Sequence, residues 1–437
     1  MATGITKSHW DDSVNIISYE GFTEDTTYEI NYKGKKRYED VIGEVNNCDY
    51  IPLKGEGDNA MYYGDNADVL RYLLHHCGMK ESVKLIYIDP PYGTNSIFQS
   101  RNQKSSYRDD LIGSHYLEFM RRRLILMKEL LRRDGSVYVH LDNNMVSQIK
   151  VIMDEIFGVK NFRGMITRKK CSNKNSTKRT YGNISDYILF YSKSDDFLWN
   201  RPTVAWSDDK IKKEYPCIDE KTGRRYKKVP IHAPGVRNGE TGKMWRNMMP
   251  PKGKHWQYTP QRLDEFDLNG EIYWSSTGNP RRKVFLDSDK GIPVQDIWLD
   301  VQDSLNQNIK ITGYPTEKNG LLLERIIKAS SVEGDLVLDC FAGSGTTLAI
   351  AQRLNRRWIG IDNSSEAIGS ILKRFTDGTE KMGSHLRQDI ETPHNQSLFE
   401  ADKIELCGDK EALDYGFRLF SDEKHIDELQ KLIDTYL

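Results

Sequence analysis

Cysteine is scarce in this chain, and its six cysteines are widely separated. The absence of any C-x-x-C pair argues against zinc modules and thioredoxin-type sites, so we expect reduced thiols and no bound metal. The sequence also lacks an apolar run of the roughly 18 residues that a membrane span requires. Its N-terminal residues lack the apolar segment of a secretory signal. These absences favour a soluble cytoplasmic protein that does not contact a membrane.

Net charge is almost absent as well, since 63 basic residues stand against 64 acidic ones. The balance is uneven along the chain. Residues 161–185 contain seven Lys or Arg and no acid, and residues 221–257 contain ten against Glu240 alone. Acidic residues predominate in 390–437. A basic middle segment is typical of a phosphate-binding surface, although a solvated charge cluster gives the same pattern.

Short apolar runs alternate with helical repeats over much of the sequence, which predicts an α/β doubly wound, mostly parallel sheet. The pattern stops near residue 161 and resumes near residue 316. The predicted strands are 61–63, 83–88, 136–141, 336–339 and 358–361. The predicted helices are 67–77, 115–133, 145–157, 321–329, 346–354, 367–375 and 425–437.

Five segments follow from this pattern. Two of them share one α/β domain, which the irregular basic segment interrupts as an insert. They are an N-terminal extension (1–54), a first α/β half (55–160), the basic insert (161–310), a second α/β half (311–380) and an acidic C-terminal extension (381–437).

A glycine turn follows the strand that ends at Asp339. Gly343 and Gly345 let the backbone turn sharply and pass close to a ligand. Asp362 ends the next strand, where a doubly wound fold places the carboxylate that accepts hydrogen bonds from ribose hydroxyls. Neither a Walker loop nor a full G-x-G-x-x-G is present. The alternative is an ordinary strand-to-helix turn.

The loop Asp89-Pro90-Pro91-Tyr92 follows strand 83–88 and is stiff, because two prolines continue neither a strand ladder nor a helix. An exocyclic amino group on a base is a poor nucleophile, since its lone pair is delocalised into the ring. The Asp89 carboxylate and the Pro90 carbonyl could accept its N–H bonds and aim the lone pair at a methyl donor. Tyr92 could stack on an extruded base. The alternative is a proline-rich turn in which Tyr92 only packs.

Together these motifs resemble the amino-methyltransferases of restriction-modification systems, and closely the β-class, Mod-type adenine-N6 DNA methyltransferases. In that class the Asp-Pro-Pro-Tyr loop precedes the recognition insert, and the glycine motif that binds S-adenosylmethionine (AdoMet) comes last. The resemblance covers about residues 55–375 outside the insert. It implies a Rossmann-like, seven-stranded AdoMet-dependent methyltransferase sheet with circularly permuted motif order and an inserted DNA-recognition domain.

The resemblance also implies roles for individual residues. It makes Asp89, Pro90, Pro91 and Tyr92 the catalytic loop. Two positions depart from the family pattern: Glu317 stands where glutamine is common, and Asn319 where proline is usual. The implied AdoMet-binding residues are Asp65, Asn66, Thr316, Lys318, Asp339, Phe341, Gly343, Ser344, Gly345, Thr346, Asp362 and Asn363.

The expected macromolecular partner is double-stranded DNA, bound by the basic insert. Basic side chains fix a protein on the duplex through its phosphates and carry no sequence information themselves. The chain shows no nuclease motif, so a separate restriction subunit is an expected partner, and relatives suggest a homodimer. The candidate phosphate contacts are Arg168, Lys169, Lys170, Lys174, Arg224, Arg225, Lys227 and Lys228.

Several other functions remain open. Cytosine-N4 methylation uses the same chemistry, but its enzymes usually carry serine at the Asp89 position, so we favour adenine. Cytosine-C5 methylation needs a Pro-Cys loop, and Pro216-Cys217 has no strand leading into it. Methyltransferases that act on RNA or on protein amides commonly carry asparagine at the position of Asp89, so this function is disfavoured. A catalytically inactive DNA-binding subunit is disfavoured because Asp89 and the glycine motif are intact.

Overall fold

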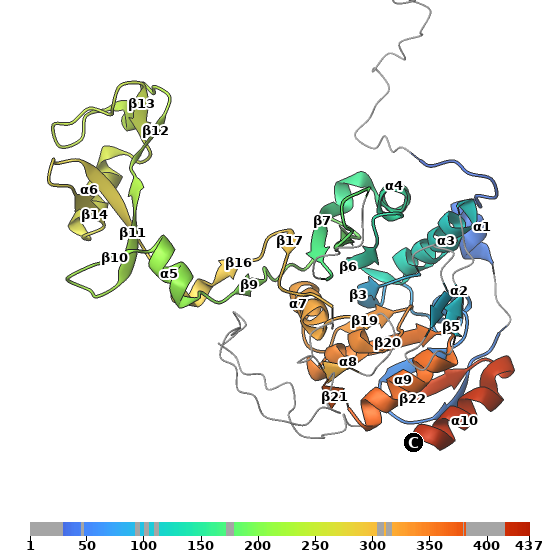
Figure 1. Cartoon of the computed structure of the whole chain (residues 1–437). Coiled ribbons are helices and arrows are strands. Elements are labelled where there is room, and N and C mark those ends of the chain that lie inside the picture. The colour runs from blue at the N-terminus through green and yellow to red at the C-terminus, as the bar shows by residue number, and fades with distance from the viewer. Residues whose placement is uncertain are drawn as a thin grey trace, which may run out of the picture. The chain divides into compact units, whose positions relative to one another are not determined.

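The computed structural model describes residues 29–44, 48–91, 97–99, 105–108, 113–171, 179–303, 310–311, 317–378, 380–381 and 416–437. Of the candidate site residues, Tyr92, Lys174 and Thr316 lie outside the described residues. The chain forms two compact units (Figure 1). Arg201–Gln295 make the inserted unit, and the described residues on either side of it make the main unit.

The main unit is built on a large twisted sheet. Its strands run parallel from β22 through β6, β8 is antiparallel to both of its neighbours, and β1 is antiparallel at one edge. The predicted α/β, mostly parallel class is therefore confirmed. Among the described residues ten strands form this sheet, in the order β1 (Ile51–Lys54), β22 (Phe417–Ser421), β2 (Asn59–Tyr63), β20 (Arg357–Asp362), β19 (Leu336–Asp339), β3 (Val83–Ile88), β6 (Leu131–Leu141), β8 (Ser185–Ser192), β7 (Phe162–Lys169) and β17 (Ile297–Trp298).

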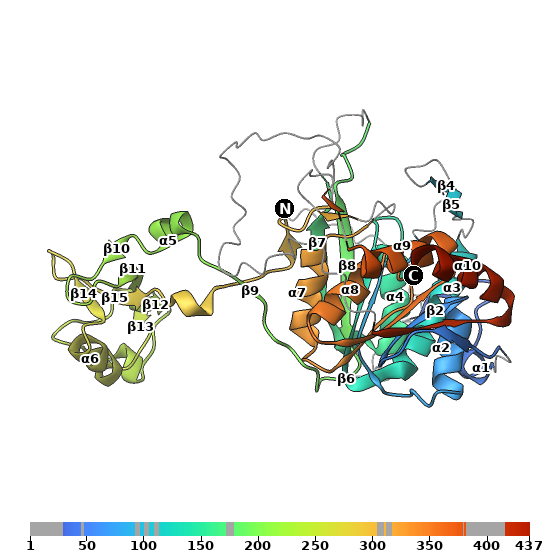
Figure 2. The same cartoon turned by 90° about the horizontal axis from the view of Figure 1, so that it is seen from below.

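Helices cover both faces of this sheet (Figure 2). On one face α2, α3 and α4 pack side by side and share an apolar core with Ile86 and Ile88 of β3. Alternate residues of a strand point to opposite faces, so Tyr87 lies on the other face, with Leu323 of α7. The helices of the main unit are α1 (Tyr38–Gly43), α2 (Asn66–His75), α3 (Ser114–Leu130), α4 (Val146–Phe157), α7 (Gly320–Ser330), α8 (Thr346–Arg353), α9 (Ser365–Thr376) and α10 (Ile426–Tyr436).

Strand β3 spans the predicted residues, Val83–Ile88, and all six of them are buried. A parallel strand covered on both faces is a continuous apolar run, which is why the sequence identifies it. Its one charged residue, Lys84, reaches the Asp134 carboxylate at 2.7 Å. Pro90 and Pro91 then end the strand and turn the chain at its carboxyl end.

The sheet is wider than the seven strands expected, because segments on both sides of the α/β halves join it. Strand β22 pairs in parallel with β2, and β1 pairs with β22, so part of each expected extension is sheet structure. Phe417 of β22 is fully buried against the rings of Trp358 and Phe375. Helix α10 packs on α9. The acidic C-terminal segment therefore ends in elements that complete the main core.

The inserted unit is smaller than the expected 161–310 segment, because β7, β8 and β17 pair within the main sheet. Its four-stranded antiparallel sheet has the order β10-β11-β15-β14. Ile231, Trp245, Trp256, Leu263, Phe266 and Ile272 form its core. Its elements are β9 (Thr203–Val204), α5 (Asp208–Glu214), β10 (Cys217–Ile218), β11 (Arg225–Pro230), β12 (His232–Pro234), β13 (Lys254–Trp256), α6 (Pro260–Leu268), β14 (Ile272–Trp274), β15 (Pro280–Phe285) and β16 (Ile292–Pro293).

The two ends of the inserted unit are paired with each other. Strand β9 lies near its start and β16 near its end, and Thr203 faces Pro293 in an antiparallel ladder. The backbone N–H of Val294 also donates to the carbonyl of Pro202 at 3.0 Å. The chain therefore enters and leaves this unit at one place.

Two further short antiparallel pairs are described in the main unit, β4 (Ile97–Gln99) with β5 (Ser105–Arg108) and β18 (Lys310–Ile311) with β21 (Glu380–Lys381). Within the described part of the chain, every helix is too short or too polar to span a bilayer.

Replacing Phe417 with alanine tests whether β22 is integral to the main core. Removing a fully buried aromatic ring should lower the free energy of unfolding by about 3–5 kcal/mol, because the cavity left behind does not close. Denaturant unfolding followed by circular dichroism measures this. Arg418→Ala, the exposed neighbour on the same strand, is the control and should cost under about 1 kcal/mol. If both variants lowered the free energy of unfolding by the same small amount, β22 would not be integral to the main core.

Candidate active site

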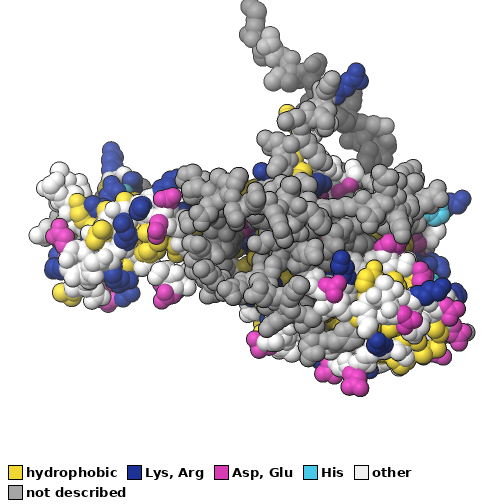
Figure 3. All heavy atoms as spheres, turned by 60° about the horizontal axis from the view of Figure 1, so that its bottom comes forward, with side chains coloured by type: hydrophobic (Ala, Val, Ile, Leu, Met, Phe, Trp, Pro, Cys, Tyr) yellow, Lys and Arg dark blue, Asp and Glu magenta, His cyan; other side chains and the backbone are white. Residues whose placement is uncertain are grey.

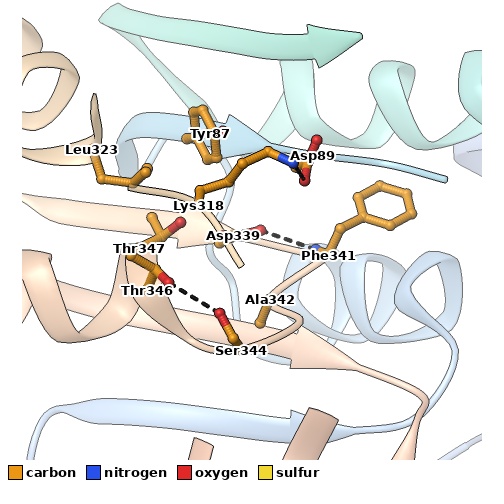
Figure 4. Close-up of a pocket in the computed structure, with 10 residues that line it drawn as sticks. All are labelled: Tyr87, Asp89, Lys318, Leu323, Asp339, Phe341, Ala342, Ser344, Thr346 and Thr347. Atoms are coloured by element: carbon orange, nitrogen blue, oxygen red, sulfur yellow. Dashed lines mark hydrogen bonds and ion pairs between the residues drawn. The ribbon is translucent and has the colours of Figure 1, made fainter. Parts of the chain in front are cut away.

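A pocket opens at the carboxyl ends of β3 and β19, which are parallel neighbours in the main sheet. Ligands bind at this edge in open α/β sheets. The two motifs, which lie far apart in the sequence, meet there (Figure 4). Its lining includes Asp89, Lys318, Asp339, Phe341, Ser344 and Thr346 from the predicted site, and also Tyr87, Leu323, Ala342 and Thr347.

Lys318 reaches across the pocket to the carboxylate of Asp89. Its ammonium lies 2.6 Å from Asp89 Oδ2, and only 9% of the lysine side chain and 19% of the aspartate side chain are exposed. Figure 4 shows the lysine chain running past Tyr87 to end on Asp89. An opposite charge at this distance orients the carboxylate. Lys318, which the sequence assigned to the cofactor, thus also contacts the predicted catalytic loop.

The glycine turn after β19 is shaped by local constraints. Gly345, with φ at 72°, caps α8, and a Cβ added there would lie 2.8 Å from Cγ1 of Ile371. Gly343 also has a positive φ, and its N–H donates to Asp362 Oδ2 at 2.8 Å. The turn therefore needs glycine at both positions. It is tied to the end of β20 through Asp362.

Two acids beside this turn are kept partly uncharged by burial. Burial raises the pKa of Asp339 to about 7, even though Thr347 and the N–H of Phe341 donate to its carboxyl group. Burial also raises the pKa of Asp362 to about 6, against hydrogen bonds from Gly343 and Ser364. Buried carboxylates gain from further donors or a cation. The pocket therefore suits a ligand that carries hydroxyl groups and positive charge, as AdoMet does.

Glu317, one of the two departures, has a specific partner in the structure. Arg374 of α9 is buried, forms an ion pair with Glu317, and donates to the carbonyl of Ser344 at 2.7 Å and to the Thr346 hydroxyl at 3.2 Å. Because a buried guanidinium needs a counter-charge, glutamate serves here where a neutral glutamine would not. This pair fixes the Lys318 segment against the glycine turn.

Asn319, the other departure, begins helix α7. Its side-chain oxygen accepts from the N–H of Leu321 at 3.0 Å, and its amide donates to the carbonyl of Gln302 at 2.9 Å. Asparagine is among the strongest helix N-caps. The capping hydrogen bond therefore restrains the start of α7, as proline does in relatives that carry it at this position.

Asp65, Asn66, Asp362 and Asn363 are not among the pocket-lining residues. Asp65 caps α2 and lies 3.0 Å from the guanidinium of Arg123. Asn66 donates to the carbonyl of Cys340 at 2.7 Å. The Gly64-Asp65-Asn66 turn thus contacts the start of the glycine loop through Asn66. Asn363 is exposed at the end of β20.

The candidate DNA contacts fall into two groups. Arg168, on β7, is fully buried, where it donates to the carbonyl of Val301 at 2.9 Å and pairs with Asp303. Lys169 is half-buried, and Lys170 lies 2.8 Å from Asp186. These contacts tie β7 into the main unit, so Arg168 is a structural arginine and is withdrawn from the phosphate contacts.

The second group lies in the inserted unit. Arg224 is exposed beside the ring of Phe285, and Lys228 lies over Tyr273, with its ammonium 3.5 Å from the ring centre. Arg225 and Lys227 are half-buried near Tyr215. Figure 3 shows Lys and Arg side chains exposed on this unit. Across the described residues of both units, no group of three or more His, Cys, Asp or Glu is placed to hold a metal ion.

Residues 83–373, more than half of the chain, match the family model of the N6 and N4 DNA methylases. The chain belongs to this DNA methylase family. It is 47% identical to the type II methyltransferase M.EcaI of Enterobacter cloacae, over 83% of this chain and 80% of that protein. It is 27% identical to the StyLTI Mod subunit of a type III restriction-modification enzyme of Salmonella typhimurium, over 75% of this chain and 56% of that protein.

Solved structures give weaker likenesses, which add nothing to the family assignment. The cytosine-N4-specific PvuII DNA methyltransferase is 16% identical with a TM-score of 0.41, over 76% of this chain and 93% of that one. The M1.HpyAVI–SAM complex is 17% identical with a TM-score of 0.37, over 72% and 98%.

This methylase is therefore an AdoMet-dependent DNA amino-methyltransferase of the restriction-modification type, as the motifs predicted. Its pocket is lined by five of the twelve residues expected to bind AdoMet, namely Lys318, Asp339, Phe341, Ser344 and Thr346. Sequence reasoning missed four residues that line the pocket. Tyr87 and Leu323 resembled ordinary core residues, and Ala342 and Thr347 lie within or next to the glycine motif. Sequence reasoning also missed Arg374, whose signal was a lone arginine on the apolar face of a helix.

Asp339→Asn should stabilise the cofactor-free protein at pH 8 and weaken AdoMet binding at least tenfold. A carboxyl group whose pKa is raised on folding binds more protons in the folded state, so the free energy of unfolding falls as pH rises from about 4 to about 7. The shift corresponds to at most about 4 kcal/mol. Asparagine does not ionise, so the free energy of unfolding no longer falls over this pH range. Asparagine also lacks the negative charge that favours a cationic ligand.

Denaturant unfolding at pH 5 and pH 8, with calorimetric titration of AdoMet, measures both effects. Asp377→Asn, at an exposed aspartate at the end of α9, is the matched control and should change neither. Unchanged AdoMet affinity in Asp339→Asn would remove this residue from the cofactor site.

Proposed function

We propose that this enzyme transfers a methyl group from AdoMet to N6 of an adenine flipped out of double-stranded DNA. The observation that carries the choice of adenine is Asp89 at the head of the loop, where cytosine-N4 enzymes usually have serine. Its carboxylate lies in the cofactor pocket, oriented by Lys318. Flipping is needed because the amino group is inaccessible inside the duplex.

Positioning and electrostatics would account for most of the catalysis. Asp89 and the carbonyl of buried Pro90 would accept the two N–H bonds of the target amino group, and Pro91 restrains that carbonyl. AdoMet supplies an activated methyl group when it is bound. The two acceptors hold the nitrogen in line with this group, which requires no covalent intermediate on the enzyme. Tyr92 would stack on the flipped base.

We assign cofactor binding to residues of both motifs. Asp339, Phe341, Ser344 and Thr346 line the pocket, and Gly343 and Gly345 shape the turn above it. Asp362 would accept from the ribose hydroxyls. The other proposed contacts are Asp65, Asn66, Thr316, Lys318 and Asn363.

The inserted unit would hold the duplex through its phosphates. Arg224, Arg225, Lys227 and Lys228 provide positive charge on or next to β11. Such contacts set affinity and register, whereas base reading needs other side chains in the grooves. We also propose a homodimer, a separate restriction subunit and a cytoplasmic location.

Cytosine-N4 methylation is the second candidate, because the family includes both activities and their chemistry is the same. The product decides between them. Incubation with labelled AdoMet and mixed-sequence DNA, followed by digestion to nucleosides, should give N6-methyladenine. N4-methylcytosine as the labelled nucleoside would overturn the choice of base, and label in RNA or protein alone would overturn the substrate.

Asp89→Ala should lower the rate of methyl transfer by about 10²–10³-fold, because the target amino group loses its charged acceptor. AdoMet binding should persist, which calorimetry checks beside the nucleoside assay. Asp196→Ala, at an exposed aspartate after β8, is the control and should stay fully active. A fully active Asp89→Ala variant would refute the catalytic assignment.

Arg224→Ala and Lys228→Ala should each weaken DNA binding similarly for all sequences and reduce the slope of log affinity against log salt by about 1. Fluorescence anisotropy with two unrelated duplexes at several salt concentrations measures both. Lys431→Ala, an exposed lysine of α10, should leave the slope unchanged. Slopes equal to the wild type in both insert variants would exclude these phosphate contacts.

A further inference from the structure

Buried polar side chains continue from Asp89 across the main sheet. Strand β6 pairs in parallel with β3, with Ile88 beside Val139, so the next residues along, Asp89 and His140, are neighbours on one face. Strand β8 pairs with β6 and brings Asp186 to the same edge. The amino-methyltransferase chemistry above uses none of Tyr87, His140 and Asp186, although each is at least 98% buried.

Tyr87 and His140 share a hydrogen bond, and His140 faces Asp186 at ion-pair distance. Tyr87 Oη lies 2.8 Å from His140 Nδ1, and His140 Nε2 lies 3.5 Å from Asp186 Oδ2. Lys170 lies 2.8 Å from the other oxygen of Asp186. Because the carboxylate faces Nε2, the proton of a neutral imidazole belongs on Nε2. His140 Nδ1 is then the acceptor for the Tyr87 hydroxyl, and Tyr87 itself lines the pocket.

Burial keeps His140 neutral, and charged groups of both signs surround it. It is faced by Tyr87 and Asp89 from β3 and its loop, Asp186 from β8, Arg168 from β7 and Lys318 from the segment before α7. Burial lowers the pKa of His140, so the imidazole is uncharged at neutral pH. Burial opposes ionisation of Asp186, yet the neighbouring cations of Lys170 and a protonated His140 hold the pKa of this carboxyl well below its usual range. An imidazolium formed here would have a carboxylate beside it.

We propose that Tyr87, His140 and Asp186 form a relay that accepts the proton released by the target amino group. This relay rests on the proposed amino methylation at Asp89, and it serves adenine and cytosine equally. Asp89 is less suited to take the proton, because its carboxylate is already paired with Lys318 at 2.6 Å. Tyr87 would be a catalytic residue, and His140 and Asp186 would be positioning residues that act through it.

The step balances as follows. The amino nitrogen forms a bond to the methyl carbon while the carbon–sulfur bond breaks, and the electron pair of that bond stays on sulfur, which becomes a neutral thioether. The nitrogen then loses one proton to Tyr87 Oη, while the original hydroxyl proton of Tyr87 passes to His140 Nδ1. The resulting imidazolium is stabilised by the Asp186 carboxylate, and its proton returns to solvent after the methylated product leaves the pocket.

The chain supplies a matched control for this tyrosine. Tyr138 of β6 lies directly beside Tyr87 in the ladder, and it is equally buried. Its hydroxyl bonds to Ser330 at 2.7 Å, and its ring stacks on Phe190. It is absent from the described lining of the pocket. The two Tyr→Phe variants therefore remove the same atom from neighbouring buried sites, and only one of these atoms belongs to the relay.

The experiment measures single-turnover methyl transfer at saturating AdoMet, on a DNA that the wild type methylates. Tyr87→Phe should lower the rate constant about 10²-fold, as loss of general acid–base assistance does. Tyr138→Phe should stay within about twofold of the wild type. Calorimetric AdoMet affinity should be unchanged in both variants. Equal rate constants for Tyr87→Phe and Tyr138→Phe would overturn the relay.

A pH profile gives a readout that a structural role would not move. The wild-type rate constant should fall at low pH, as His140 becomes protonated and no longer accepts. In His140→Gln the rate constant should be low, and it should no longer fall at low pH. An unaltered low-pH limb in His140→Gln would remove the histidine from the relay.

The two proposals fail differently. A wild type that methylates no amino group of DNA removes the proposed function, and the relay with it. An active wild type whose two Tyr→Phe variants behave alike removes only the relay.

Discussion

The hydrogen-bonded pairing of β3 with β19 is the contact on which the active site depends. It sets Leu85 beside Val337 and Ile86 beside Leu338, so both strands end at one edge of the sheet. A slip of one residue would turn every side chain of a strand to the opposite face. Asp339 and Tyr87 would then leave the pocket. The buried apolar residues of these strands thus determine where the catalytic and cofactor residues meet.

Several charged or polar side chains are buried near this edge. Asp339, His140, Asp186, Arg168 and Arg374 are all buried, and each has a partner that offsets part of its desolvation. Buried polar groups of this kind lower the stability of the fold, and they are found mainly at functional sites. In this enzyme Arg374 holds the segment before α7 against the glycine turn, and Arg168 holds β7 against Val301 and Asp303. The geometry of the pocket therefore depends on charge pairing as well as on apolar packing.

The sequence predicted the central strands well for a physical reason. Residues 83–88 and 336–339 are covered on both faces, so they are mostly apolar, and their predicted bounds agree with the structure. The residues that bear chemistry follow these strands directly. Six of the predicted site residues consequently line the pocket.

Other features depend on contacts between distant segments, which local patterns do not record. Strand β22 is five residues long and completes its pairing with β2, from the opposite end of the chain. Charge counting placed Arg168 on a DNA surface, but its partner Asp303 comes from a remote segment that covers it. Tyr87 read as a core residue, because its partner His140 is on another strand. Glu317 departs from the family pattern in the sequence, and its reason lies in Arg374, a partner on the distant helix α9.

The pairing of β9 with β16 gives the inserted unit a single point of attachment, since Thr203 and Pro293 are neighbours. The unit also has its own core around Trp245 and Trp256. A segment whose ends meet, and which packs on itself, is exchangeable as a cassette without disturbing the sheet that carries it. Recombination at these two junctions could thus give an unchanged methylation chemistry a new surface for DNA. The architecture keeps the methylase pocket and the basic inserted unit in separate cores, so the two can evolve at different rates.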